Sequence, residues 1–317
     1  MSRCILFDDR FSLESPTGAL LNVYRAEPRS DPRGVALLSH GMAEHAGRYA
    51  RLAGELSGAG IAVYAHDHRG HGSTTAPDAP LRTFAKTNGS AKLVADCHAV
   101  RRFAEDAHPH RPVVMLGHSM GGLIAFNYAM RHGTGLAGLS VWNAGHRFGF
   151  QERLGLIALK IERMLKGSDT VSGIFEQAAT GPWSKAIQPR RTRADWLSHD
   201  EEAVDAFLQD PLCSWSPTNA MAADLIALVR IMTDGTDASS LPPSLPLHIV
   251  GGTGDPSTGY AKAVQAHVDR LRLAGCRDVT LTIVDGARHE TLNEVKAYRQ
   301  PAMASLWAWL DRVLPNA

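Results

Sequence analysis

The sequence predicts an α/β fold in which a mostly parallel central sheet has helices on both faces and contains a helical insertion. Short apolar runs typical of buried strands alternate with helical patterns along residues 34–143 and again along residues 245–317. Between these two parts, about ninety residues contain no strand-like run, which is long for a connection within one sheet. We therefore expect one interrupted sheet, in a chain long enough for a large core.

The first half of the chain supplies most of the predicted sheet. Residues 10–27 alternate loosely around a proline and a glycine, as expected for a hairpin or for two edge strands. Residues 34–41 and 61–66 are typical of buried strands, and the amphipathic segment 47–60 between them completes a βαβ unit. A helix over 91–108, a strand over 113–116, a helix from Leu123 onward and a strand within 136–144 are then expected in that order.

Two helices expected in the insertion have an apolar stripe. In residues 152–167 the stripe contains Leu154, Ile157, Ala158, Ile161, Met164 and Leu165, and in residues 219–232 it contains Met221, Leu225, Leu228, Val229 and Met232. Such stripes most often face a core, although in a lid part of that surface can line a pocket.

The second half of the sheet follows the insertion. Residues 246–255 and 278–290 resume the strand pattern, each with a loop at its end, and residues 303–314 form a terminal helix. We therefore predict a core made of residues 1–144 and 244–317, with residues 145–243 as a helical lid.

The composition is that of an ordinary globular protein. With 21% charged residues, 44% hydrophobic residues and a formal net charge of +1, the chain gives no electrostatic reason to expect nucleic-acid binding. The apolar run at Cys4–Phe7 is too short for a signal peptide. No apolar stretch approaches the roughly eighteen residues that suggest a transmembrane segment. A cytoplasmic protein without a transmembrane segment is therefore expected.

Neither the cysteines nor the glycines indicate a bound group. The four cysteines are scattered and include no CxxC pair, so we expect reduced thiols rather than a disulfide framework or a zinc site. No GxGxxG fingerprint follows a predicted strand, and we therefore expect no cofactor.

The most informative motif lies between the strand at 113–116 and the helix that follows it. Residues 117–121 read GHSMG, a full match to GxSxG. In a strand–turn–helix context this motif predicts a sharp elbow that holds the serine side chain out at the edge of the sheet. The helix N-terminus behind the elbow favours negative charge that develops beside the serine. We therefore predict that Ser119 is a nucleophile.

A serine nucleophile needs a base and an acid that orients the base. Ligands bind beyond the carboxyl ends of parallel strands, so the partners are expected just after strands. Asp255 ends one strand pattern, and His289 lies in the loop after the last one, so the chain order is Ser119, Asp255, His289. Asp285 is an alternative acid, but its position four residues before His289 suits a loop cap better.

The reaction also needs donors for the negative charge on the substrate oxygen. One backbone N–H comes from the residue after the nucleophile and another from the loop after an earlier strand. The sequence therefore predicts an oxyanion hole formed by the amides of Met120 and Met42. Five further residues of these motifs are expected to hydrogen-bond the loops rather than contact substrate. They are Glu44, Arg48, Asp67, Arg69 and His71.

Together these motifs resemble one branch of a known superfamily. HGMAEHAGRYARLA, AHDHRGHGST, GHSMGG, the pair Gly254–Asp255 and ARHETLNE are similar to the monoacylglycerol lipase and lysophospholipase branch (serine aminopeptidase S33-type, Hydrolase_4) of the α/β-hydrolases. The resemblance is close over residues 34–143 and 245–317, and residues 191–215 resemble the lid of bacterial members. One departure is Thr258, where the family commonly has an apolar residue, and it bears on the packing of that loop.

The resemblance implies a serine ester hydrolase with an α/β-hydrolase fold and a helical lid. It assigns Ser119 as nucleophile, Asp255 as acid and His289 as base, with Met42 and Met120 in the hole. The implied partner is a small acyl ester such as a monoacylglycerol or a lysophospholipid. A short-chain esterase, an amidase or peptidase, and an acyltransferase with the same residues remain alternatives. Spare apolar surface on the lid could touch lipid or a second lid, and the oligomeric state is open.

Two further classes of protein are remote alternatives. His66, His68 and His71 reproduce the histidine spacing of a metal-dependent hydrolase site, although Gly70 stands where that motif has an aspartate. The second class is a binding protein that kept the fold and lost the chemistry. A metal site would also need several more ligands, and this stretch already belongs to a motif of the resemblance. The presence of nucleophile, acid, base and hole in one order argues against the binding protein.

Overall fold

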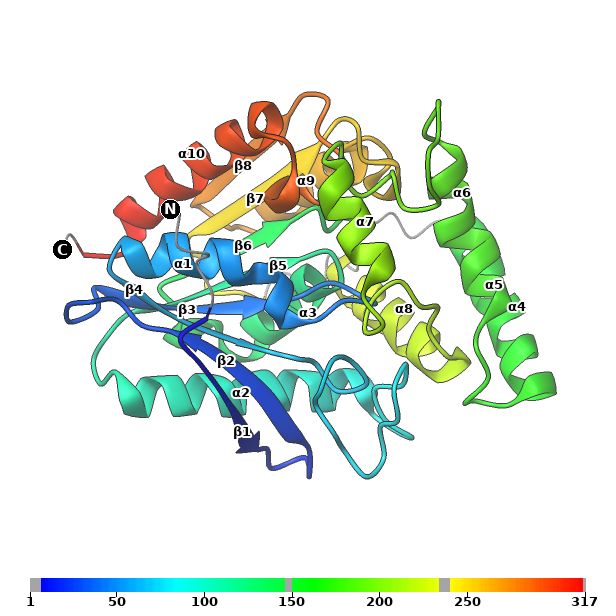
Figure 1. Ribbon diagram of the computed structural model, residues 1–317, viewed down its shortest axis with the longest axis horizontal. Helices are drawn as coiled ribbons and strands as arrows, with labels where there is room; N and C mark the ends of the chain where they lie inside the picture. The colour runs from blue at the N-terminus through cyan, green and yellow to red at the C-terminus, as the bar shows by residue number, and fades with distance from the viewer. Residues whose placement is uncertain (1–6, 146–149, 234–239, 316–317) are drawn as a thin grey trace.

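The computed structural model describes residues 7–145, 150–233 and 240–315, and for residues 150–152 it describes the backbone alone. Its centre is an eight-stranded sheet in the order β1-β2-β4-β3-β5-β6-β7-β8 (Figure 1). The strands are β1 (Asp9–Glu14), β2 (Leu20–Ala26), β3 (Gly34–Ser39), β4 (Ile61–His66), β5 (Val113–His118), β6 (Gly138–Trp142), β7 (Leu247–Gly252) and β8 (Val279–Val284). The two pairs that involve β2 are antiparallel and the others are parallel, which confirms the predicted sheet.

The hairpin alternative for residues 10–27 is confirmed, and only one of its strands lies at the edge of the sheet. β1 and β2 pair along their whole length, and β2 continues the sheet by pairing with β4. From Arg10 to Glu14, exposed positions alternate with half-buried ones, as expected for an edge strand with one solvated face.

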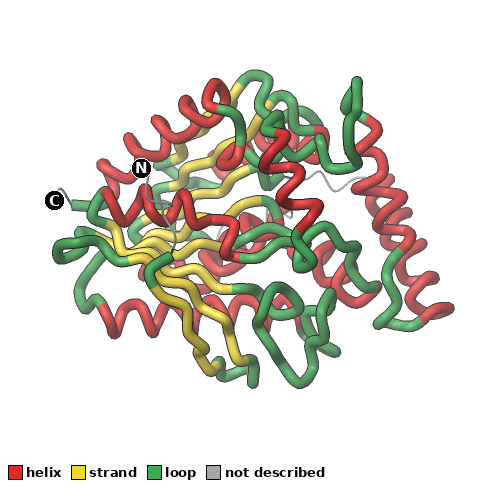
Figure 2. Tube along the Cα trace, in the orientation of Figure 1, coloured by secondary structure: helices red, strands yellow, loops and turns green. Residues whose placement is uncertain are grey.

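Helices cover both faces of the sheet (Figure 2). α1 (Ala50–Gly58) and α10 (Lys296–Val313) pack on one face, and α2 (Gly89–Ala107), α3 (Met120–His132) and α9 (Lys262–Leu273) pack on the other. Along β3, Val35 and Leu37 face the second group of helices, while Ala36 and Leu38 face the first. Because β3 is buried on both faces, its sequence is a continuous apolar run rather than an alternating one.

The regular elements of the predicted insertion are helices in its described residues, and loops and turns join them. It contains α4 (Phe150–Lys166), α5 (Gly173–Phe175), a π-helical turn (Glu176–Thr180), α6 (Gly181–Lys185), α7 (Glu201–Gln209) and α8 (Asn219–Thr233). α4, α5 and α6 form the outer layer of the insertion, at the right of Figure 1, and α8 lies between them and the sheet helices. The proposed lid, residues 145–243, includes residues 146–149 and 234–239, which lie outside the described residues.

The prediction for the two apolar stripes is right for α8 and wrong for α4. On α8, Met221, Leu225, Leu228 and Met232 are at most 6% exposed and belong to the main core. The stripe on α4 faces solvent: Leu154, Ile157, Ile161, Met164 and Leu165 are 47–77% exposed. The buried side of α4 is instead formed by Leu159 and the carboxylate of Glu162. Periodicity identifies a helix, but it does not identify the face that finds a partner.

The described residues add two findings on thiols and membrane spans. Cys97, Cys213 and Cys276 are buried and free, as expected, while Cys4 lies outside the described residues. Among the helices of the described segments, none combines the length and the apolar character that a membrane crossing requires.

Candidate active site

The elbow around Ser119 has the strained geometry that the GxSxG motif predicts. Ser119 adopts φ +53° and ψ −121° between β5 and α3, a conformation that costs a non-glycine residue about 1–3 kcal/mol. Its N–H donates to the carbonyl of Trp142 on β6 at 2.9 Å. A Cβ on Gly117 would lie 2.2 Å from the Gly121 oxygen, and one on Gly121 would lie 2.0 Å from the Ser39 oxygen. Only glycine therefore permits α3 to start so close to the ends of β5 and β3.

The structure brings Ser119, His289 and Asp255 into one chain of hydrogen bonds. Ser119 Oγ lies 2.8 Å from His289 Nε2, and His289 Nδ1 lies 2.9 Å from Asp255 Oδ2. The side chains of His289 and Asp255 are 5% and 0% exposed. Each of the three follows the end of a parallel strand, β5, β8 or β7, so they meet at one edge of the sheet.

The negative charge of Asp255 is stabilised by the side chains around it. Burial alone would disfavour the carboxylate, but His289 and hydrogen bonds from Ser257 and Asn143 hold the pKa of Asp255 below its ordinary value. The alternative acid, Asp285, is not among these side chains, because it accepts a hydrogen bond from the Thr253 hydroxyl at 2.7 Å in an exposed loop.

Ser257 is a polar residue of the site that the sequence interpretation missed. Its hydroxyl oxygen lies 2.8 Å from His289 Nδ1 and 2.7 Å from Asp255 Oδ1. Its backbone N–H also donates to Asp255 Oδ1 at 2.9 Å, which makes Asp255 the cap of the short 3-10 helix Pro256–Thr258. The pattern Asp-Pro-Ser is typical of such a turn and was the available signal.

The loop after β3 and the loop after β8 are joined by a buried ion-pair network. Arg48 donates to both carboxylate oxygens of Glu290 at 2.7 and 2.8 Å and also pairs with Glu44. Glu44 accepts a hydrogen bond from the N–H of Gly41, at the start of the loop that contains Met42. The bidentate arginine therefore ties the loop predicted to form the hole to the loop of the candidate base.

His118, the residue before Ser119, links the same two loops. Its Nε2–H donates to the carbonyl of His289 at 2.9 Å, and its Nδ1 lies 3.7 Å from Glu44. Burial disfavours a charged imidazole, but the Glu44 carboxylate outweighs burial and raises the pKa of His118. In turn, burial would raise the pKa of Glu44, whereas Arg48 and His118 hold it well below its ordinary value.

Met42 and Met120, the predicted oxyanion residues, line the same cavity as Ser119. Met120 is the first residue of α3, where backbone N–H groups have no partner within the helix. The loop with Met42 is also fixed from the insertion, because Ser214 N–H donates to the Ala43 carbonyl at 2.9 Å. The role of the two amides stays a prediction.

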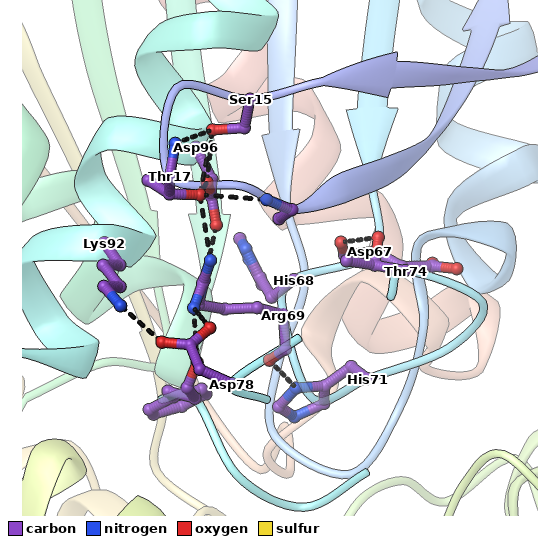
Figure 3. A network of polar contacts seen from close by, with 12 residues as sticks. Ser15, Thr17, Asp67, His68, Arg69, His71, Thr74, Asp78, Lys92 and Asp96 are labelled. Carbon is purple, nitrogen blue, oxygen red and sulfur yellow. Dashed lines mark hydrogen bonds and ion pairs between the residues drawn. The ribbon is translucent and has the colours of Figure 1, made fainter. Parts of the chain in front are cut away.

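The other motif residues hold loops, as expected. The carboxylate of Asp67 accepts hydrogen bonds from the backbone of Ala46 and Ser73 at 2.9 and 2.8 Å. Arg69 is fully buried and pairs with Asp96 at 2.8 Å and with Asp78 at 3.1 Å (Figure 3). These contacts join the loop after β4 to α2 and to the loop after β3, and they lie behind the cavity wall rather than in it.

The three histidines of the metal alternative do not converge as a set. His66 and His68 lie with Cys97, their ligand atoms being within 4.8 Å of one another, and His71 is outside this group. The ring of His71 packs against Trp215, with centroids 4.7 Å apart, and its Nδ1–H donates to the Arg69 carbonyl at 3.3 Å. Burial lowers the pKa of His66 to about 4, so that histidine is neutral inside the core.

A cavity of about 760 Å³ opens in front of Ser119, between the sheet edge and the insertion. Its size lies in the range of small-molecule sites. The insertion contributes most of the residues that line it, and many of these are apolar, among them Leu159, Phe175, Trp183, Leu225 and Val229.

Part of the insertion is bound directly to the candidate base. The N–H groups of His289 and Glu290 donate to the carbonyls of Trp196 and Leu197 at 3.4 and 2.6 Å. The ring of Trp196 lies against the His289 imidazole, with centroids 4.9 Å apart. Arg288 adds two hydrogen bonds to carbonyls of the segment 195–198. These contacts therefore fix the segment 195–198 of the insertion against the loop after β8.

Comparison with known proteins agrees with this geometry. Residues 30–296 match the family described as Serine aminopeptidase, S33 (Hydrolase_4). The chain belongs to this family. It is a hydrolase with the α/β-hydrolase fold, and the motif segments that resemble the family in sequence lie around Ser119 in space.

Two relatives of the chain are lipases by name. The monoacylglycerol lipase of Mycolicibacterium smegmatis is 31% identical over 84% of this chain and 85% of its own. The monoglyceride lipase of Homo sapiens is 33% identical over 97% of this chain and 92% of its own. Among solved structures, a thermostable carboxyl esterase from Bacillus coagulans in complex with glycerol has a TM-score of 0.86 and 25% identity, covering 96% of this chain and 98% of its own.

Proposed function

We propose that the protein is a serine ester hydrolase whose substrates are acyl esters such as monoacylglycerols or lysophospholipids. The observation that supports this most directly is the chain of hydrogen bonds Ser119–His289–Asp255, with 2.8 and 2.9 Å between the paired atoms, at the floor of an apolar cavity. In this arrangement a neutral imidazole can take the serine proton, and a carboxylate can stabilise the cation that results.

The proposed reaction has two halves. Ser119 Oγ attacks the ester carbonyl carbon as its proton passes to His289 Nε2, and Asp255 stabilises the imidazolium. The amides of Met42 and Met120 donate to the oxygen that becomes negative. His289 then protonates the leaving alcohol. Water then attacks the acyl-enzyme as its proton passes to His289. The bond to Ser119 Oγ breaks, His289 returns the proton to Oγ, and the carboxylic acid leaves.

The cavity supports an acyl chain as the apolar part of the substrate. Its wall is mainly apolar, and a fatty acyl chain gains free energy on leaving water at about 0.8 kcal/mol per buried CH₂. The relatives named as monoacylglycerol and monoglyceride lipases and the esterase in complex with glycerol support a glycerol ester.

A peptidase or amidase is the second candidate, because the family is described as a serine aminopeptidase. Hydrolysis of short-chain esters and acyl transfer stay possible in chemical terms, since the same three side chains serve all of these reactions. These four reactions differ in leaving group, acyl acceptor and acyl length. The cavity must therefore select among substrates that differ in these three features.

The test is a rate comparison across matched ester, thioester and amide substrates of short, medium and long acyl chains, including a 1-monoacylglycerol. We expect Ser119-dependent hydrolysis that favours medium or long acyl esters. Ser57→Ala, at a half-buried position of α1 that does not line the cavity, is the matched serine control and should keep the wild-type rate. Faster cleavage of aminoacyl amides than of any ester would replace this proposal with the peptidase.

We further propose that residues 145–243 act as the lid of a core made of residues 1–144 and 244–317, and that α4 touches a lipid surface. Five apolar side chains of α4 are 47–77% exposed, while the opposite side of the helix reaches the cavity through Leu159. Basic side chains are interspersed with the stripe: Arg153, Lys160, Arg163 and Lys166. An exposed apolar helix face with basic residues suits the interface of an anionic membrane.

Vesicle flotation tests the lipid contact. With vesicles of phosphatidylcholine and phosphatidylglycerol, we expect the double variant Met164→Ser/Leu165→Ser to bind about 10-fold less than wild type, since two apolar side chains no longer leave water. Leu273→Ser removes an equally exposed leucine from α9, which lies outside the lid, and should bind like wild type. Equal binding of all three proteins would contradict the contact. A concentration-dependent dimer that both α4 substitutions disrupt would point to lid pairing instead.

A cytoplasmic location is also proposed, and it rests on the cysteines alone. Three described cysteines are free although they are buried in a folded chain, which suits a reducing compartment. Fractionation of the host cells with an antibody to the protein would test it, and recovery in the secreted fraction would contradict it.

A further inference from the structure

Ser257 lies next to the hydrogen bond between His289 Nδ1 and Asp255 Oδ2. Its Oγ lies 2.8 Å from His289 Nδ1, while Asp255 Oδ2 lies 2.9 Å from the same nitrogen. We propose that Ser257 is a positioning residue that shares the Nδ1 proton of His289 with Asp255. This inference rests on the proposed hydrolase function and adds a fourth side chain to its machinery.

The donors and acceptors of the cluster allow one arrangement in which His289 can act as base. His289 must present an unprotonated Nε2 to Ser119, so its single ring proton is on Nδ1. That N–H faces two acceptors, Asp255 Oδ2 and Ser257 Oγ. Because Ser257 Oγ accepts from the ring, its own proton is free to donate to Asp255 Oδ1, 2.7 Å away. Each group then has a partner, and the three side chains close a ring of hydrogen bonds.

The local backbone fixes the hydroxyl in this position. Asp255 caps the 3-10 helix Pro256–Thr258, and the Ser257 N–H donates to Asp255 Oδ1 at 2.9 Å. Pro256 restricts the backbone at the first position of the turn. An alanine at position 257 would keep the N–H bond and the turn, and would remove only the hydroxyl. The site therefore offers a substitution that separates the hydroxyl from the fold.

The shared proton constrains His289 in two ways. Two acceptors on Nδ1 favour the tautomer that leaves Nε2 free for Ser119, and they fix the orientation of the ring. When the imidazolium forms, the Ser257 oxygen also faces the charged N–H in a buried site, where a hydrogen bond to a charged group is stronger than one between neutral groups. Loss of Ser257 is therefore expected to slow the chemical step while substrate binding is retained.

A direct contact with His289 must be distinguished from an indirect effect through Asp255. If Ser257 only supports the carboxylate, its hydroxyl has no role once Asp255 is alanine. If Ser257 holds Nδ1–H itself, it becomes the remaining acceptor in that variant. The two roles therefore differ in the Asp255→Ala background.

The kinetic test uses a soluble ester with wild type, Ser257→Ala, Asp255→Ala and the double variant. We expect Ser257→Ala to lower kcat about 10-fold with KM unchanged, and to lower it about 10-fold again in the Asp255→Ala background. Ser257→Thr, which keeps a hydroxyl, should restore most of the rate, and Ser57→Ala should match wild type. A wild-type kcat for Ser257→Ala, or no further loss in the Asp255→Ala background, overturns the proposal.

A second measurement does not depend on turnover. The Nδ1 proton of His289 should give a low-field NMR resonance in protein with ¹⁵N-labelled histidine, identified by its loss in His289→Gln. We expect Ser257→Ala to change its chemical shift and speed its exchange with water, and Ser57→Ala to leave both unchanged. Identical spectra for wild type and Ser257→Ala overturn the proposal. If Ser119→Ala retained activity, the proposed function would fail instead, while this resonance would still report the contact.

Discussion

The insertion between β6 and β7 contains two helices with the same kind of sequence and opposite surroundings. α4 and α8 both have an apolar stripe with helical period, yet the α8 stripe is buried in the core, with Leu228 at 0% exposure, while Met164 and Leu165 on α4 are 77% and 76% exposed. α8 packs against α2 and α3, which cover the sheet, and α4 packs against α8 and α5 at the outside of the insertion. The difference indicates that an apolar stripe on α8 serves folding, whereas the stripe on α4 is available for an external surface.

The buried carboxylate of Glu162 on α4 is a second difference between α4 and α8. Glu162 lies on the side of α4 that faces the protein, and its carboxylate accepts hydrogen bonds from the Ser172 hydroxyl and from the N–H groups of Gly173 and Ile174. α4 is therefore joined to the next helix by polar contacts around one carboxylate, whereas α8 is held by apolar packing.

The largest expected effect is on α8. Leu228→Ala removes a fully buried side chain and should lower the free energy of unfolding by about 2–5 kcal/mol, from lost burial and the cavity that remains. Urea denaturation measures it. A loss below about 0.5 kcal/mol, the size expected at an exposed site, would mean that the α8 stripe does not serve folding.

A smaller effect is expected at the polar anchor of α4. Glu162→Ala leaves the Ser172 hydroxyl and two backbone N–H groups without their acceptor, which should cost about 1–3 kcal/mol locally. Limited proteolysis in the segment 167–180 should become faster, while the urea midpoint of the whole protein changes little. Lys160→Ala, an exposed residue of the same helix, provides the control, and equal proteolysis of both variants would contradict the anchor.

The same carboxylate predicts a pH dependence. Burial would raise the pKa of Glu162, but its hydrogen bonds, with Lys166 and Ser172 foremost, lower it from the ordinary value of 4.5. A lowered pKa in the folded state means that the stabilisation is present above about pH 4.5 and is lost as the pH falls through the folded value. Hydrogen exchange at Ile174, corrected for the intrinsic rate, should therefore rise below that pH in wild type and show no such pH dependence in Glu162→Gln. Protection of Ile174 that stays constant through this range would contradict the assignment.

The smallest effect is expected on the exposed stripe. Leu165→Ala on α4 should change the free energy of unfolding by less than about 0.5 kcal/mol, because the side chain is 76% exposed and alanine favours helix. Urea denaturation beside Leu228→Ala gives the comparison directly. A loss of about 2 kcal/mol or more, as expected for a buried leucine, would show that α4 is covered in the folded protein.

Most of the fold and the main site residues could be predicted because their signals are local. Strands buried on both faces read as continuous apolar runs, and residues at strand exits share one edge of a parallel sheet, so the sequence alone predicted that Ser119, Asp255 and His289 meet. The glycines of GxSxG are equally local, since the contacts that forbid a Cβ lie within the elbow and the end of β3.

What could not be predicted depends on contacts between distant segments. The Arg48–Glu290 pair joins residues 242 positions apart, and the exposure of α4 depends on which helix lies beside it. The histidine spacing at 66, 68 and 71 suggested three ligands, but the chain turns His71 away and brings Cys97 from α2 instead. Ser257 was missed because its contacts with His289 and Asp255 depend on how the 3-10 turn orients its hydroxyl, and residue type alone does not show that orientation.

The central claim is that Ser119 hydrolyses acyl esters in the cavity under the lid. The most direct measurement is the rate of free fatty acid release from a 1-monoacylglycerol by wild type and by Ser119→Ala, with both proteins checked for the same thermal unfolding. The account predicts turnover by the wild type and a loss of at least about 10³-fold in the variant. Equal rates for the two proteins, or no release by wild type from any acyl ester, would contradict it.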